Sequence, residues 1–263
     1  MNRSLKKVLR ILGIILLFLG IIWLSLFTPV DRSPYQESEF YQQMDARLDS
    51  LGSVFIGNGS TDSLFIGWSR VSITPSHLMP LAGYSNRNPK LMEGIHDSIF
   101  VRAVVFKKGD NKAAIVSADL LIIHPEVTRK IMASLPSNWE IDQLFLTATH
   151  SHSSMGGWAP GLVGEAIAGF EDDTVAQFIA DRVIQSLKIS ESNLEYGKVG
   201  MVESNLEPMV YNRLVQEKGK VDPWLKSILI DKDDELGILN FFLPMLHVLI
   251  VNGMSCQVIF PVG

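Results

Sequence analysis

An uncharged apolar run near the amino terminus limits what this chain can become more than any other feature. Residues 11–30 are apolar except for Ser25 and Thr28 and contain no charged side chain. As a helix, about 20 such residues span the hydrocarbon core of a bilayer. Basic residues precede the run and Asp31 follows it. The positive-inside rule therefore predicts a cytoplasmic basic tail at 1–10, a transmembrane anchor at 11–30, and the rest of the chain on the extracytoplasmic (periplasmic or extracellular) side.

A cleaved signal peptide is the alternative explanation of the same run. The apolar region of a signal peptide is shorter, and a cleavage site of small residues follows it. Here the run is longer, and no A-x-A-like site follows Leu26. The sequence therefore favours a retained anchor over a cleaved signal.

The charge balance of the remaining chain excludes one large class of partners. The chain has 23 basic and 28 acidic side chains, and four of the basic ones lie before residue 30, which leaves 19 basic against 28 acidic. Nucleic-acid binding needs clustered Lys and Arg, so we expect no nucleic-acid partner. A single cysteine, Cys256, likewise excludes an intrachain disulfide and a CxxC metal knuckle.

Hydrophobic patterning beyond the run predicts a polar linker followed by an α/β domain. Residues 31–63 are polar and are expected to form a stalk with a short helix around 39–51. Strand and helix patterns then alternate over 64–242, so we expect a mixed β-sheet with flanking helices. We expect 143–148 to be a buried strand, with a long loop after it. The expected strands are 65–75, 99–106, 112–119, 143–148, 195–202 and 228–242, and the expected helices are 125–135 and 174–189.

The segment 146–157, LTATHSHSSMGG, concentrates the residue types that carry chemistry. It begins in a predicted strand and contains His150 and His152. On an extended backbone, residues two positions apart point to the same side, so both imidazoles can reach one metal ion. Gly156 and Gly157 allow backbone N–H groups to approach a ligand closely. Two histidines do not complete a zinc site, which needs at least three protein ligands, and hydrogen-bonded histidines without a metal are the alternative.

Other polar residues have a structural explanation beside the functional one. Asp119, at the end of a predicted strand, either faces a site or accepts hydrogen bonds from neighbouring N–H groups. His96 lies in a turn-rich stretch and is a candidate site residue at the surface. Arg213 either forms a surface ion pair or anchors a substrate. Glu165 and the acidic residues 171–173 are expected in a solvated loop that favours the positive end of the following helix.

Seven segments of the chain occur in an order typical of one enzyme family. They are GWSRVSITP, AGY, GIHDSIFVRAVVF, AAIVSADLL, LTATHSHSSMGG, YNR and DELGILNFF. In this order they resemble the N-terminal catalytic domain of the neutral/alkaline non-lysosomal ceramidases and their bacterial relatives, over about residues 68–242. The most specific of them, TATHSHSSMGG, is similar to THTHSGPGG in the family, with Ser for the second Thr and Ser-Met for Gly-Pro.

This resemblance implies zinc-dependent hydrolysis of the amide bond of ceramide or a related N-acyl lipid. It implies that His150, and after it His152, binds Zn²⁺. Residues expected to line the substrate site are Asn212, Arg213 and 156–157. Zinc would polarise the carbonyl and supply a water of lowered pKa for attack on the acyl carbon. The expected partners are a lipid amide and the membrane, and a shared fold does not fix which N-acyl lipid is cleaved.

The family pattern stops matching after residue 242. The family has a second zinc histidine in a segment like FxxHAT, then an SGDxPG-like turn, whereas His247 here lies in LPMLHVLIVNGM. One choice of codons for 244–263, read one base back, gives HATCLNSKWHELPGDFPG, which is close to the family's sequence there. The hypothesis is that the tail 243–263 is a frameshift product and that 64–242 is an incomplete ceramidase-type domain.

Three functions are compatible with these observations. The intact gene product is a membrane-anchored zinc amidohydrolase of the ceramidase type; or the 263-residue chain is a fragment with an incomplete metal site; or the chain is an anchored binding protein whose histidines are structural. The resemblance favours the first for the gene product. The unmatched segments favour the second for this polypeptide. The sequence does not indicate an oligomeric state.

Overall fold

The structure is a computed structural model that describes most of the chain in two parts. The described residues are 3–26, 33–55, 63–84, 90–137, 139, 141, 143–207, 210, 212, 219, 221–232, 235–241 and 255–256. The chain divides into two units, Met1–Ser60 and Thr61–Gly263. Every strand that the structure describes belongs to the second unit, and so do both candidate histidines.

A long apolar helix, α1, begins the first unit. It spans Arg3–Leu26, and its stretch Ser4–Ser25 has a mean hydropathy of 2.5 with none of it buried. That length and composition suffice to cross a bilayer, and a signal sequence has the same properties. The helix begins before the predicted anchor at 11–30, because the residues of the basic tail continue the same helix. Residues 27–32 lie outside the described part of the chain.

The polar linker contains a helix where its sequence predicts one. A 3-10 turn, Tyr35–Glu37, precedes α2, Glu39–Phe55. The rings of Tyr35 and Tyr41 meet edge to face, with centroids 5.4 Å apart. Within α2, the side-chain amide of Gln43 donates to Glu39 at 3.0 Å. The contacts described for this helix are local, and its described side chains are mostly exposed.

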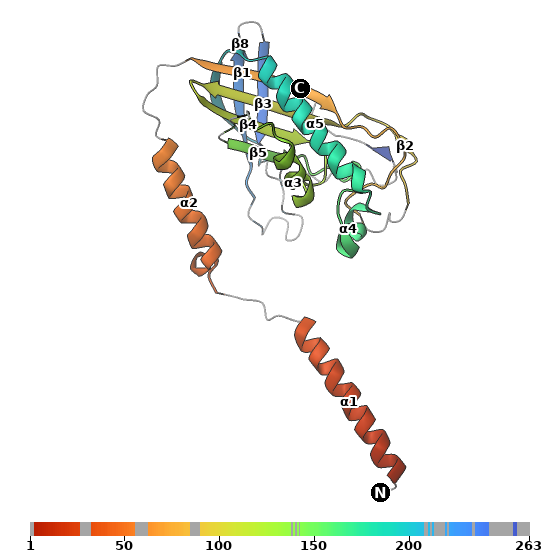
Figure 1. Cartoon of the computed structure of the whole chain (residues 1–263). Coiled ribbons are helices and arrows are strands. Elements are labelled where there is room, and N and C mark those ends of the chain that lie inside the picture. Colours follow the sequence, from red (N-terminus) through yellow and green to blue (C-terminus); the bar gives the residue numbers. More distant parts are fainter. Residues whose placement is uncertain are drawn as a thin grey trace. The chain divides into compact units, whose positions relative to one another are not determined.

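A mixed five-stranded sheet forms the centre of the second unit (Figure 1). β3 and β4 form the predicted hairpin, with Lys108 opposite Asn111. β4 and β5 pair in parallel, and the other neighbouring strands pair antiparallel. The predicted mixed α/β class is therefore confirmed. In spatial order the strands are β5 (Gln143–Ala148), β4 (Asn111–Ala118), β3 (Phe100–Lys108), β1 (Leu64–Ser72) and β6 (Glu195–Tyr196).

Two helices cover one face of this sheet (Figure 1). They are α3, Pro125–Ser134, and α5, Asp173–Ser192. α5 packs on β1 and β3 and against α3. The apolar stripe of α5 is the one that helical spacing predicts, and it belongs to the main hydrophobic core. Its buried members include Val175, Ile179, Val183 and Leu187.

Small side chains let α5 lie very close to β1. A Cβ atom added at Gly67 would lie 1.9 Å from the backbone oxygen of Ser190, so no larger residue fits there without a shift of the backbone. Ser69 Oγ donates to the Ser186 carbonyl at 2.7 Å, and Ser190 Oγ donates to the Ala103 carbonyl at 3.0 Å. The buried hydroxyls of this contact are therefore hydrogen-bonded.

A separate antiparallel sheet lies against the other face. Its strands are β7 (Lys198–Asn205), β8 (Trp224–Lys232) and β9 (Glu235–Phe241), in that spatial order. Ile230 of β8 packs with Ile66 and Val104 of the five-stranded sheet in a second, smaller core. Ile66 and Gly67 are consecutive residues of β1, so the side chain of Ile66 points to the face opposite the one on which Gly67 meets α5. The domain therefore has a helical layer, a central sheet and a second sheet.

Two predicted strands differ from the structure. The strand expected at 195–202 is divided at Gly197 into β6 and β7, which belong to different sheets. The strand expected at 228–242 is instead a hairpin of β8 and β9, in which Lys232 lies opposite Glu235. The charged run 231–235, DKDDE, separates the two apolar arms and is the turn signal that the prediction of one continuous strand overlooked.

α4, β2 and β10 complete the second unit. Two predictions, a loop and a buried strand, differ from the structure here. α4, Gly161–Ala168, lies in the stretch that we expected to be a loop. The prediction missed this helix because its glycines weaken the helical signal. β5 is an edge strand with Phe145 61% exposed, so the prediction that it is buried is wrong. β2, Gly94–Ile95, pairs in parallel with β10, Ser255–Cys256.

Candidate functional site

The loop that follows β5 carries both candidate histidines. We call residues 149–157 the histidine loop. On one side, the backbone N–H of Ser151 donates to the Leu120 carbonyl at 3.1 Å, which extends the pairing of β4 and β5. On the other side, the backbone N–H of Ala82 donates to the Ser154 carbonyl at 3.0 Å. The main chain on both sides therefore fixes the position of the loop.

His150 is held in one orientation by the backbone. Its φ is +57°, which is uncommon for a residue other than glycine. Its Nδ1 atom lies 2.9 Å from the carbonyl oxygen of Leu121. A carbonyl oxygen only accepts hydrogen bonds, so Nδ1 carries a proton, and the corresponding neutral tautomer has its lone pair on Nε2. A histidine that binds a metal through Nε2 has this tautomer.

His150 and His152 bring their Nε2 atoms together. These atoms lie 3.3 Å apart, and the two rings are nearly perpendicular at 85°. In a tetrahedral site with Zn–N bonds of about 2.0–2.1 Å, two ligand nitrogens lie about 3.3 Å apart. This distance is also that of a hydrogen bond between the two rings, as in the alternative of hydrogen-bonded histidines without a metal. It is therefore compatible with two corners of a zinc site and with a metal-free pair. The prediction of an extended backbone at His150 is wrong, because its φ is left-handed, but the two rings lie side by side.

The described residues bring no third metal-binding side chain to the two histidines. These residues contain no group of three or more His, Cys, Asp or Glu side chains that could hold a metal. His96, a weaker candidate, follows β2 with its Nδ1 3.0 Å from Asp97 Oδ2, and its side chain is 64% exposed. His247 lies outside the described residues. A complete zinc site needs at least three protein ligands, so these two histidines alone do not make one.

Asp119 lies buried beneath the histidine loop and is bound by donors of the chain itself. One guanidinium nitrogen of Arg102 donates to both carboxylate oxygens, and the backbone N–H of Phe100 donates to Oδ2 at 2.8 Å. Burial raises the pKa of Asp119, although Arg102 acts to lower it. The backbone oxygen of Asp119 accepts a hydrogen bond from Ser154 Oγ. These contacts match the structural alternative for Asp119, not a role at an open site.

The two glycines of the histidine loop use their N–H groups within the chain. Gly156 donates to the Pro80 carbonyl and Gly157 to the Ala168 carbonyl, each at 2.7 Å. A Cβ atom added at Gly156 would lie 1.9 Å from the Ala168 oxygen. The close approach that we expected for a ligand is therefore made by the end of α4. Gly156 and Gly157 pack the loop and do not present free amides to a ligand.

The Asn212–Arg213 pair is described only in part. Asn212 is partly buried, and a Cβ atom added at Gly219 would lie 2.3 Å from its Cγ atom, so these two residues are close neighbours. Arg213 lies outside the described residues. Its expected place at the substrate site stays a prediction.

Two residues beside His152 were not predicted as site residues, although they belong to AGY, one of the seven segments that resemble the family. Gly83 has a φ of +111°, and a Cβ atom added there would lie 2.4 Å from His152 Nδ1. The ring centroid of Tyr84 lies 4.6 Å from that of His152. The available signal was a Gly-Tyr pair that ends the apolar stretch MPLAGY. Only the fold brings this pair to the histidines.

One of the acidic residues before α5, Asp172, caps that helix. Asp172 Oδ1 accepts a hydrogen bond from the backbone N–H of Thr174 at 2.9 Å. The hydrogen bonds from the side chain and backbone of Thr174 lower the pKa of Asp172. Glu165 differs from the prediction, because it belongs to α4 and not to a loop.

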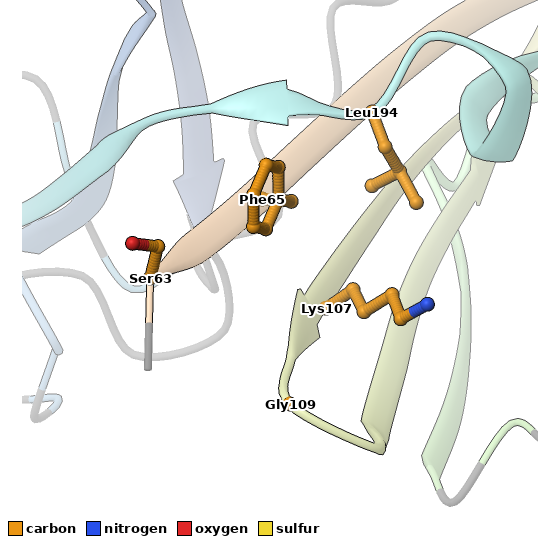
Figure 2. A pocket seen from close by; sticks show the side chains of 5 residues that line it. All are labelled: Ser63, Phe65, Lys107, Gly109 and Leu194. Carbon is orange, nitrogen blue, oxygen red and sulfur yellow. The ribbon is translucent and has the colours of Figure 1, made fainter. Parts of the chain in front are cut away.

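The larger hollow in the surface lies away from the histidines. It has a volume of about 540 Å³ and is lined by Ser63, Phe65, Lys107, Gly109 and Leu194 (Figure 2). Leu64 pairs with Lys108, so these residues mark the end of the sheet where β1 begins and β3 finishes. Ala118 and Ala148 pair at the opposite end of the strands, where β5 leads into the histidine loop. This hollow is therefore not part of the candidate site.

Comparison with protein families gives one match over the same part of the chain. Residues 65–217 match the family described as neutral/alkaline non-lysosomal ceramidase, N-terminal. This range covers the five-stranded sheet, both of its helices and the histidine loop.

Curated relatives agree with the family match. A neutral ceramidase of Pseudomonas aeruginosa is 25% identical over 181 residues, which cover 62% of this chain and 27% of that protein. A neutral ceramidase of Mycobacterium tuberculosis is 25% identical over 184 residues, 62% of this chain and 29% of that protein. A neutral ceramidase of Drosophila melanogaster is 28% identical over 155 residues, which cover 56% of this chain and 22% of that protein. The chain thus spans less than a third of the length of these relatives.

Solved structures share the fold of the second unit. The crystal structure of neutral ceramidase from Pseudomonas aeruginosa has a TM-score of 0.59 and 22% identity, and the match covers 70% of this chain and 32% of that one. A structure described as a ceramidase complexed with C2 has the same TM-score and identity. That match covers 69% of this chain and 31% of the other chain.

Proposed function

This chain belongs to the neutral/alkaline non-lysosomal ceramidase family, which it matches over more than half of its length, and we propose that it carries the zinc-binding histidines of a lipid amidohydrolase. The proposed substrate is ceramide or a related N-acyl lipid, since the curated relatives bear the name neutral ceramidase. The observation that carries the proposal is the 3.3 Å separation of the Nε2 atoms of His150 and His152.

The proposed chemistry assigns each histidine a defined task. When bound, zinc supplies Lewis acidity toward the amide carbonyl and a water whose pKa is lowered to about 7. His150 offers the lone pair of Nε2, because its Nδ1 proton is held by Leu121. His152 directs a second nitrogen to the same point. The histidine loop is bonded to main chain on both sides, so binding a metal requires little rearrangement.

A second function is favoured by one specific observation. The described residues bring together two metal-ligating side chains and no third, whereas a zinc site needs at least three. As an alternative, this chain is catalytically incomplete and needs a ligand from outside the described residues, or its histidines serve structure alone in an anchored binding protein.

One experiment separates these alternatives. The full chain, purified in detergent, would be assayed for bound zinc and for release of fatty acid from an N-acylsphingosine, with and without a chelator. Stoichiometric zinc and an activity that the chelator abolishes and added zinc restores support the zinc hydrolase. Weak zinc binding without activity supports the incomplete domain. A stable fold with neither zinc nor activity supports the binding protein and contradicts the zinc hydrolase.

We also propose that α1 anchors the domain to a membrane, with its amino terminus in the cytoplasm. Its stretch Ser4–Ser25 has the length and hydropathy of a span, and its basic residues lie at the amino-terminal end. Carbonate extraction of membranes, combined with the intact mass of the extracted chain, tests this proposal. We expect a carbonate-resistant chain with its amino terminus retained. A soluble product that begins after α1 would show a cleaved signal instead.

A further inference from the structure

We infer that Gly83 and Tyr84 are positioning residues that fix the imidazole of His152 opposite His150. Their chemical purpose rests on the proposed zinc site, but their effect on His152 is a property of the metal-free chain. Gly83 has no side chain, and Tyr84 meets His152 through its ring. Both act through the ring of His152.

Gly83 forms one wall against the His152 ring. The ring lies so close that an added Cβ atom would come within 2.4 Å of Nδ1 and 2.8 Å of Cγ. Real Cβ atoms do not approach other heavy atoms to this distance, so one of the two residues would have to move. The φ of Gly83, +111°, is also a conformation that side-chain-bearing residues rarely adopt. Glycine at this position is thus required twice, by the ring and by the backbone.

Tyr84 forms a second wall with its aromatic ring. The centroids of the Tyr84 and His152 rings lie 4.6 Å apart, and the ring planes are inclined at 36°. Aromatic pairs at this separation attract each other beyond the area that they bury. The His152 ring therefore contacts backbone at Gly83 and an aromatic ring at Tyr84.

The backbone of Gly83 cannot easily yield to a larger side chain. Its N–H donates to the Ile167 carbonyl of α4 at 2.8 Å. Just before it, Leu81 bridges to Met155 of the histidine loop, and both of these side chains are fully buried. A side chain at Gly83 would therefore displace His152 and not the backbone. This displacement would separate the Nε2 atom of His152 from that of His150.

A double-mutant cycle in the metal-free chain tests this inference. The midpoint of thermal unfolding would be measured, with chelator present, for the full-length protein and for Gly83→Ala, His152→Ala and the double variant. The strain of φ at Gly83 is the same in both backgrounds, whereas the clash with the ring exists only when His152 is present. We expect Gly83→Ala to lower the midpoint more in the wild-type background than in the His152→Ala background.

The outcomes of the cycle are decisive even if Gly83→Ala does not fold. Recovery of folding in the double variant supports the clash with His152. An equal loss in both backgrounds, or failure of both variants to fold, overturns the inference. Gly94→Ala is the matched control, since an added Cβ atom at Gly94 meets nothing within 4 Å. We expect it to leave the midpoint unchanged.

Zinc affinity gives a second readout. A residue that only stabilises the fold would leave this affinity unchanged. Titration of the folded chain with Zn²⁺ should show a loss of roughly 10- to 100-fold for Tyr84→Ala, as for residues that orient a ligand. Tyr84→Phe keeps the ring and should restore the affinity. Unchanged affinity in Tyr84→Ala overturns the role of Tyr84. If the wild-type chain binds no zinc, the proposed function fails, while the unfolding cycle still decides whether Gly83 positions His152.

Discussion

Arg102 and Asp119 meet beneath the histidine loop, where one guanidinium nitrogen lies 2.9 Å from each carboxylate oxygen. The carboxylate is fully buried, and the side chain of Arg102 is 31% exposed. The backbone oxygen of the same aspartate accepts from Ser154 of the loop. The pair therefore connects the central sheet to the segment that holds the histidines.

The buried carboxylate gives the domain a characteristic dependence of stability on pH. Burial raises the pKa of Asp119, so the folded state binds this proton more tightly than the unfolded state. Its contribution to the free energy of unfolding is present at low pH and is lost as the pH rises through the raised pKa. We expect Asp119→Asn to remove this downward trend, which begins above the ordinary pKa of an aspartate, about 4.

Denaturant unfolding at a series of pH values checks this expectation. Asp97→Asn is the control, since Asp97 is an exposed carboxylate next to His96. Parallel pH profiles for the wild type and Asp119→Asn would contradict the account of Asp119.

The cap of α5 should give the opposite sign. Hydrogen bonds from Thr174 lower the pKa of Asp172, so its contribution is present above the ordinary pKa and is lost as the pH falls through the lowered one. At neutral pH we expect Asp172→Ala to lower the free energy of unfolding by about 1 kcal/mol and Asp172→Asn to retain most of it. Glu171→Ala removes a nearby charge but no cap, and chemical denaturation should find it close to wild type. An equal loss in Glu171→Ala would show a charge effect and not a cap.

The close contact between α5 and β1 predicts an unequal response of two strand glycines. Gly67→Ala places a methyl group 1.9 Å from the Ser190 oxygen, so we expect a loss of about 1–3 kcal/mol or more. Gly200→Ala on β7 meets nothing within 4 Å and should change stability little. Urea unfolding followed by tryptophan fluorescence measures both. A Gly67→Ala variant as stable as Gly200→Ala would show that α5 can move away from β1.

Local periodicity predicted much of the fold but not the parts that depend on neighbours. The hairpin of β3 and β4 and the buried stripe of α5 follow from alternation and helical spacing. The helix α4 was missed because Gly161 and Gly164 weaken its pattern, and its place is set by contacts with Gly83 and the histidine loop. The sequence did not predict that β5 lies at the edge of the sheet, because a run of apolar residues does not show whether a strand has a neighbour on one side or on both.

The sequence singled out His150 and His152 but did not predict their geometry. The spacing of His150 and His152 indicated a metal pair, but the left-handed φ of His150 and the carbonyl of Leu121 that sets its tautomer are products of the fold. Gly156 was expected to serve a ligand, and its neighbour is the backbone of α4. Sequence spacing does not distinguish a close approach to a ligand from a close approach to the chain itself.

The hypothesis on residues 243–263 makes a prediction about the gene. If this tail arises from a shifted frame, sequencing both strands over codons 238–263 will find one base missing or extra after the codon for Phe242. The corrected reading should then encode the His-Ala-Thr segment that the family resemblance leads us to expect. Nucleotides that do not allow this reading would end the hypothesis.

Titration of the full chain with Zn²⁺ shows whether the histidine pair binds zinc. Wild type, His150→Ala, His152→Ala and the exposed control His77→Ala would be compared in the same detergent after removal of metal. We predict stoichiometric zinc in wild type and His77→Ala, and its loss in both variants of the pair, whose Nε2 atoms lie 3.3 Å apart. Stoichiometric zinc retained by His150→Ala would contradict the account.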